Sequence, residues 1–184
     1  FGQLNNRSDG YCQYLTQKGV RPGDVVVLMV TPSIDFICLA LALFKLGAPI
    51  VLIDPGMGYK NLLRCIARVE ARILVGISKA VMFAKIFKKP FATVEKYFCC
   101  GTSFGIFGPD ISSCLPATSN PAPVYQPGED DLAAIIFTTG STGPPKGVRY
   151  EHAIFSAQLR LIREYYGIGQ TDVDQPAFPL FALF

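Results

Sequence analysis

Apolar runs of strand length alternate with longer segments of helical spacing along the first half of the chain. The pattern predicts strands at residues 25–30, 50–53 and 73–75, and helices at residues 11–18, 31–46 and 60–69. The predicted strands show no polar alternation, which is typical of parallel strands covered by helices on both faces. The alternation therefore predicts an α/β fold in which a doubly wound, mostly parallel sheet is layered with helices.

The ends of these segments carry the expected local signals. Thr31 is a suitable N-cap and Pro32 suits the first helical position, so we expect the second helix to begin there. Gly47 is placed to end that helix. A helix at residues 80–87 and a short strand near residues 97–98 continue the alternation.

The alternation is interrupted by a long segment rich in Gly, Pro, Ser and Asn at residues 99–131. The apolar run at residues 132–137 that follows has strand length and needs a sheet to enter. We therefore expect one domain in three parts. These are a first α/β part at residues 1–98, the connection at residues 99–131, and a strand, a loop, a short strand and a helix within residues 132–184.

A dense group of hydroxyls, glycines and one lysine follows the strand at residues 132–137. Its members are Thr138, Thr139, Gly140, Ser141, Thr142, Gly143, Lys146 and Gly147. Glycines let backbone N–H groups approach an anion, while hydroxyls donate hydrogen bonds and the lysine adds a positive charge. The run predicts a phosphate-binding loop. It differs from the P-loop of nucleoside triphosphatases because Pro145 precedes the lysine and no Ser or Thr follows it. A flexible surface turn is the alternative.

At these residues the chain resembles the adenylate-forming (AMP-binding) enzyme superfamily, whose signature is rich in Thr, Ser and Gly and ends in Pro-Lys-Gly. Further landmarks in the family's order are residues 21–24 (Arg-Pro-Gly-Asp), 44–55 and 147–152. The resemblance implies that a carboxylate attacks Mg-ATP to form acyl-AMP and pyrophosphate. It also implies that residues 1–184 are an incomplete N-terminal AMP-binding domain, cut at both ends and inactive alone. The ligands for Mg²⁺ and the catalytic residues are then expected elsewhere in the full-length protein.

Within that superfamily, residues 52–58 and 178–184 are most similar to the branch that makes β-lactones from long-chain β-hydroxy acids in olefin biosynthesis. An AMP-forming fatty-acyl-CoA synthetase, which would use coenzyme A, is the first alternative. Many such enzymes carry a histidine where Ala182 stands. A non-catalytic nucleotide-binding remnant is the second alternative.

Composition, charge and cysteine spacing limit the classes of molecule that the protein is expected to bind. Half of the residues are hydrophobic and 17% are charged, which is typical of a folded core, and the net charge of +3 is too small to indicate nucleic-acid binding. The apolar run at residues 36–44 is too short to span a membrane. The six cysteines lack zinc-site spacing and indicate core thiols in a reducing, cytoplasmic compartment. The predicted partner is a small-molecule acyl substrate, and the oligomeric state stays open.

Other residues admit a structural and a functional interpretation. The single histidine, His152, suits helix entry better than acid–base catalysis, and Asp54 suits a cap after a buried strand. Three lysines are interpreted as a solvated helix end: Lys85, Lys88 and Lys89. Three aromatic residues could line an acyl pocket or belong to the core: Phe178, Phe181 and Phe184.

Overall fold

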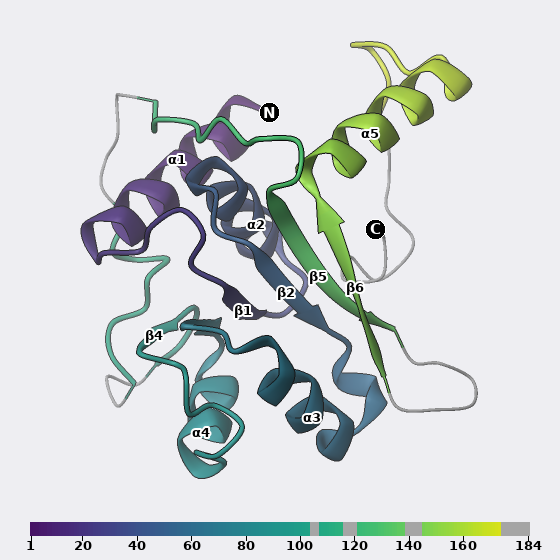
Figure 1. The fold of residues 1–184 in the computed structure, drawn as a ribbon. Helices are drawn as coiled ribbons and strands as arrows, with labels where there is room; N and C mark the ends of the chain where they lie inside the picture. Colours follow the sequence, from purple (N-terminus) through teal and green to yellow (C-terminus); the bar gives the residue numbers. More distant parts are fainter. Residues whose placement is uncertain (104–106, 116–120, 139–144, 174–184) are drawn as a thin grey trace.

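The computed structural model describes residues 1–103, 107–115, 121–138 and 145–173. Its centre is a six-stranded sheet with the order β4-β3-β1-β2-β5-β6 (Figure 1). Strands β4, β3, β1, β2 and β5 run parallel, and β6 is antiparallel to β5 at one edge. The predicted α/β class with a mostly parallel sheet is therefore confirmed.

Each predicted strand and helix has a counterpart in the structure. The strands are β1 (Val26–Met29), β2 (Ile50–Ile53), β3 (Ile73–Gly76), β4 (Lys96–Cys99), β5 (Leu132–Thr138) and β6 (Lys146–Glu151). The helices are α1 (Gly2–Gln17), α2 (Ile34–Leu46), α3 (Tyr59–Val69), α4 (Ser78–Ile86) and α5 (His152–Tyr166), with a 3-10 turn η1 (Pro55–Met57).

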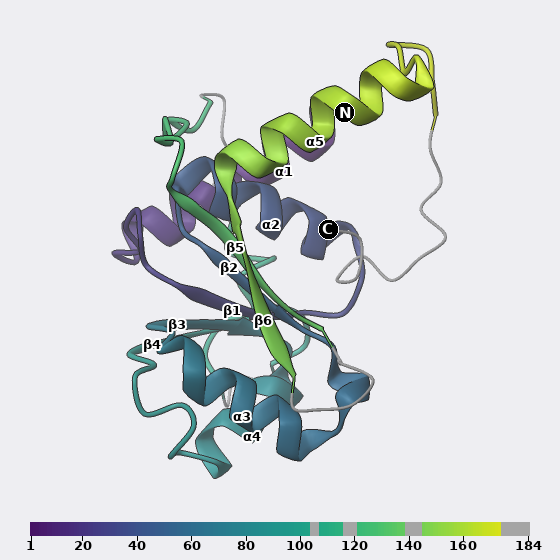
Figure 2. The same ribbon diagram turned by 45° about the vertical axis from the view of Figure 1, so that its right-hand side comes forward.

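Helices cover both faces of the sheet. Helices α1 and α2 lie on one face, and α3 and α4 lie on the other (Figure 2). Successive residues of one strand serve the two sides: Val26 and Leu28 belong to the core under α1 and α2, whereas Val27 belongs to the core under α3 and α4. This division explains why the strands are apolar at every position.

Two helix starts differ from the prediction. Helix α2 begins at Ile34, not at Thr31, because Ser33 is the N-cap and its hydroxyl accepts the N–H of Phe36 at 3.2 Å. Helix α1 begins nine residues earlier than expected, at Gly2. Its first two turns are mostly polar, so apolar spacing could not reveal them. The predicted end of α2 is confirmed, since Gly47 adopts the left-handed conformation with φ of 72°.

Polar contacts to α2 hold the first turns of α1, which have few apolar residues to bury. The Lys45 ammonium contacts the Asp9 carboxylate at 2.6 Å and the Ser8 hydroxyl at 2.7 Å. On the same pair of helices, Asp35 accepts hydrogen bonds from Arg7 and Tyr11, each at 2.7 Å. Burial and the bond to Asp35 raise the pKa of the Tyr11 hydroxyl. These contacts hold the polar start of α1 against α2.

The connection between β4 and β5 is fixed at several described points. The Tyr125 ring lies where a Cβ on Gly47 would fall, and its backbone N–H bonds the Lys45 carbonyl at 2.6 Å. Asp110 accepts the N–H groups of Gly101 at 2.8 Å and Ser112 at 2.9 Å. The chain therefore returns to the sheet along the end of α2.

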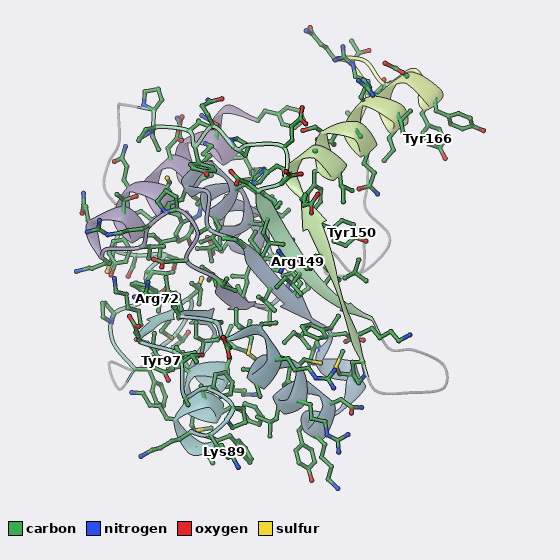
Figure 3. All side chains as sticks on the ribbon, in the orientation of Figure 1. Arg72, Lys89, Tyr97, Arg149, Tyr150 and Tyr166 are labelled. Carbon is green, nitrogen blue, oxygen red and sulfur yellow. The ribbon has the colours of Figure 1, made fainter. Side chains whose placement is uncertain are left out.

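The cysteines and the lysine cluster can be compared directly with the structure. All six cysteines are free thiols, and five of them are buried. The lysines at 85, 88 and 89 are exposed at the end of α4, where Figure 3 labels Lys89. Within the described ranges, no helix is both long enough and apolar enough to cross a bilayer.

Candidate functional site

The predicted phosphate loop connects β5 and β6 at the edge where the parallel strands end. Thr138, the last residue of β5, pairs with Lys146, the first residue of β6, and Phe137 pairs with Gly147. Strands β5 and β6 therefore form an antiparallel hairpin. Five predicted site residues lie outside the described residues: Thr139, Gly140, Ser141, Thr142 and Gly143.

Lys146 is a strand residue in the structure, whereas the sequence pattern placed it in the loop. The sequence pattern predicts a short strand at residues 148–150. The observed strand starts two residues earlier, because pairing with Thr138 extends the ladder to the base of the loop. The Lys146 side chain is exposed. A strand position fixes the backbone that carries the ammonium group while leaving the side chain free to reach an anion.

Gly147 has a packing reason to be glycine. A Cβ at this position would lie 3.1 Å from two ring carbons of Phe137 and 3.3 Å from the Ile135 side chain. The Phe137 ring is buried in the core under α3 and α4. The ring covers the glycine across the strand pair, as aromatic residues do beside glycines in sheets. The same register brings Lys146 opposite Thr138.

Arg68 supports the hairpin and was missed by the sequence analysis. It lies in the last turn of α3, and its Nη1 donates a hydrogen bond to the carbonyl of Pro145 at 3.3 Å. Pro145 is buried and immediately precedes Lys146. Seventy-seven residues separate the two partners, so no local pattern could have paired them.

His152 and Asp54 take structural positions. The backbone N–H of His152 donates to the Asp131 carbonyl at 2.9 Å, and its ring lies edge-on to Phe44 at 6.1 Å. Burial lowers the pKa of His152, and the charge of Asp131 opposes that shift. Asp54 accepts the N–H of Gly56 at 2.7 Å and caps η1. The capping interpretation of Asp54 is confirmed, and His152 begins α5 as expected.

The tail at residues 174–184, which carries the three predicted pocket aromatics, lies outside the described residues. Helix α5, which precedes this tail, packs on the rest of the fold through Phe155. The centroid of its ring lies 5.6 Å from that of Phe44 and 5.5 Å from that of Tyr150. Figure 3 labels Tyr150 on β6 below the start of α5. Among the described residues, no group of three His, Cys, Asp or Glu side chains is placed to hold a metal ion.

An open parallel sheet with a glycine-rich loop at its carboxyl edge is an architecture typical of nucleotide-binding proteins. The sequence profile of the AMP-binding enzyme family matches residues 1–181, and the chain belongs to this family. It is 36% identical over its full length to an olefin β-lactone synthetase of Stenotrophomonas maltophilia, and 35% identical to one of Xanthomonas campestris. It spans about a third of the length of each, 33%.

Solved structures give the same fold. A long-chain-fatty-acid-CoA ligase from Archaeoglobus fulgidus superposes with a TM-score of 0.78 at 26% identity, covering 97% of this chain and 35% of that one. An O-succinylbenzoate coenzyme A synthetase from Bacillus subtilis, solved with AMP, superposes with a TM-score of 0.74 at 21% identity. That match covers 98% of this chain and 43% of the synthetase.

Proposed function

We propose that the β5–β6 hairpin holds the phosphates of ATP in a full-length enzyme that activates a carboxylic acid as acyl-AMP. The observation that carries the proposal is the placement of Lys146 at the base of a Gly- and hydroxyl-rich loop, at the carboxyl edge of the sheet, in a chain of the AMP-binding family. The proposed phosphate-binding residues are Thr138, Thr139, Gly140, Ser141, Thr142, Gly143, Lys146 and Gly147.

In this reaction the substrate carboxylate oxygen attacks the α-phosphorus of ATP, and the bond to the β-phosphate oxygen breaks to release pyrophosphate. Negative charge grows on the departing phosphates. Fixed N–H groups, hydroxyls and the Lys146 ammonium stabilise that charge best in the transition state. Mg²⁺ would neutralise further phosphate charge, and we expect its ligands elsewhere in the full-length protein.

We propose a long-chain acid, with a β-hydroxyl group, as the substrate. The support is the identity of 36% and 35% to two olefin β-lactone synthetases over the whole chain. The β-hydroxyl oxygen would then attack the acyl-adenylate carbonyl and expel AMP to close a β-lactone. A fatty-acyl-CoA synthetase is the second candidate, favoured by the 26% identity to a long-chain-fatty-acid-CoA ligase. There the thiol of coenzyme A would expel AMP. The buried free thiols favour a reducing, cytoplasmic location.

The test is pyrophosphate release by the full-length protein with ATP, Mg²⁺ and either a plain or a β-hydroxy long-chain acid. Lys146→Ala should lower the rate by about a hundred- to a thousand-fold, the usual effect of removing one such donor. Lys89→Ala is the matched control, because Lys89 is exposed at the far end of α4. Its rate should equal that of the unaltered protein.

The outcomes separate the candidates. Release that needs the β-hydroxy acid but no coenzyme A selects the lactone-forming reaction. A thioester formed from a plain acid and coenzyme A selects the synthetase. No release with any acid, together with ATP binding that survives Lys146→Ala, would refute the proposal and favour a non-catalytic nucleotide-binding protein.

A further inference from the structure

The sheet has a second feature at its carboxyl edge. Between the neighbouring strands β1 and β3, the connections to the next strand turn in opposite directions along the sheet. From β1 the chain passes through α2 to β2 on one side, and from β3 it passes through α4 to β4 on the other. Helices α2 and α4 cover opposite faces (Figure 2). The loops leaving β1 and β3 therefore diverge. In open α/β sheets, ligands bind in the crevice that such divergence creates.

An apolar cavity of about 340 Å³ lies at this divergence. Its walls come from the ends of β1 and β2, from the residue after β3, and from α2, α3 and α4, and include Met29, Ile53, Leu62, Ile77 and Phe83. These residues belong to segments from both faces of the sheet, so the cavity straddles its edge. Its volume falls at the lower end of the range for small-molecule sites.

Lys79 is the one charged residue among the described residues that line the cavity, and its side chain is exposed at the start of α4. Thr31, also exposed, adds a hydroxyl from the β1–α2 loop. Asp54 lies between the lining residues Ile53 and Pro55 but outside the lining itself, and its Oδ1 accepts the N–H of Gly56 at 2.7 Å. Apolar walls with one cation at the rim match a chain-like apolar molecule with a single anionic head.

We propose that this cavity, called the switch-point cavity below, binds a medium-chain carboxylate. The alkyl chain of the ligand would lie among the apolar walls, and its carboxylate would lie beside Lys79. The site is separate from the β5–β6 hairpin, because its lining includes no described residue of β5 or β6. The proposal does not rest on the proposed function, since binding here needs neither ATP nor Lys146.

Chain length gives the first quantitative expectation. Each methylene group moved from water into apolar surroundings tightens binding by up to about four-fold. Affinity should therefore rise from hexanoate through octanoate to decanoate, until the cavity is full. Decylamine should bind more weakly than decanoate, because its ammonium group would face the Lys79 ammonium.

The experiment uses the full-length protein, without ATP, and decanoic acid carrying a photoreactive diazirine at its chain end. After irradiation, mass spectrometry should find the label on peptides containing residues 28–36 and 77–83. Lys79→Glu should lower the labelling yield at limiting probe by about ten-fold through reversal of one nearby charge. Lys89→Glu, an exposed lysine of the same region outside the cavity lining, should leave labelling unchanged.

Two further variants complete the design. Ile77→Phe should reduce labelling by filling the cavity, and Lys146→Ala should retain it even though pyrophosphate release is lost. Labels found only outside both peptides, or labelling of those peptides that is unaffected by both Lys79→Glu and Ile77→Phe, would overturn the proposal. Such a result would mean that another part of the full-length chain covers the cavity.

Discussion

The contact between Gly147 and Phe137 provides a sharp test of how the hairpin is held. In Gly147→Ala, the new methyl group would lie 3.1 Å from two Phe137 ring carbons and 3.3 Å from the Ile135 side chain. Forcing an extra methyl into a packed contact costs about 1–3 kcal/mol. Alanine returns about 0.5–1 kcal/mol because glycine loses more backbone entropy on folding. We expect the β5–β6 pairing to lose about 1–2 kcal/mol of opening free energy.

Hydrogen exchange measured by mass spectrometry on peptides from β5 and β6 reports this opening free energy directly. A loss of about 1–2 kcal/mol corresponds to exchange faster by about five- to thirty-fold. Gly128→Ala is the matched control, since the nearest heavy atom to its added methyl would be 3.7 Å away. Exchange in that variant should stay unchanged throughout the sheet.

A second substitution tests whether the ring itself is the cause. Phe137→Leu removes the ring edge that meets the new methyl, so Gly147→Ala should cost less in the Phe137→Leu background than in the unaltered protein. We expect a coupling energy of about 1 kcal/mol in the double-mutant cycle. Strictly additive effects, or unchanged exchange in Gly147→Ala alone, would refute the packing argument.

Lys45→Met should weaken the attachment of α1 to α2 by about 3 kcal/mol, because it leaves the Asp9 carboxylate, whose side chain is 5% exposed, without its cation; hydrogen exchange on these two helices measures the loss. Burial raises the pKa of the Cys100 thiol to about 11. The unfolded thiol ionises near its ordinary pKa of 9.0, so the contribution of Cys100 to the free energy of unfolding is complete below pH 9. As the pH rises from 9 to 11, the free energy of unfolding should fall by about 2–3 kcal/mol. The free energy of unfolding, measured by denaturation at each pH, should fall less between pH 9 and 11 in Cys100→Ala than in the unaltered protein. Arg68→Met removes the donor to the carbonyl before β6 and should slow pyrophosphate release by about two- to five-fold, whereas Arg64→Met, an exposed arginine of the same helix, should not.

The sheet could be predicted from sequence because its signals are local. Uninterrupted apolar runs gave β1, β2, β3 and β5 to within a residue or two, and Gly47 marked the end of α2. The first two turns of α1 could not be found in this way. They are held by ion pairs and hydrogen bonds to α2, such as that between Asp9 and Lys45, whose partners are 36 residues apart.

The candidate site also has features that local sequence predicts and features that depend on distant contacts. The composition of the loop could be recognised from sequence, because hydroxyls, glycines and a lysine occur in one short run. The packing of Gly147 against Phe137 and the bond from Arg68 to Pro145 depend on strand pairing and on a helix far away in the chain. The start of α2 shows a third case, since Thr31 and Ser33 are both suitable caps and only the backbone geometry selects Ser33.

The reversal of direction between β5 and β6 explains how Lys146 comes to lie at the carboxyl edge of the parallel strands. In a sheet of parallel strands, every strand ends at the same edge, and the next strand begins at the opposite one. Because β6 runs antiparallel, its first residue, Lys146, lies beside the last residue of β5, Thr138. A short hairpin thus places a cation at the edge where β1, β2 and β3 also end. A parallel β6 would have begun at the opposite edge of the sheet, so the same sequence motif would not have brought Lys146 beside Thr138.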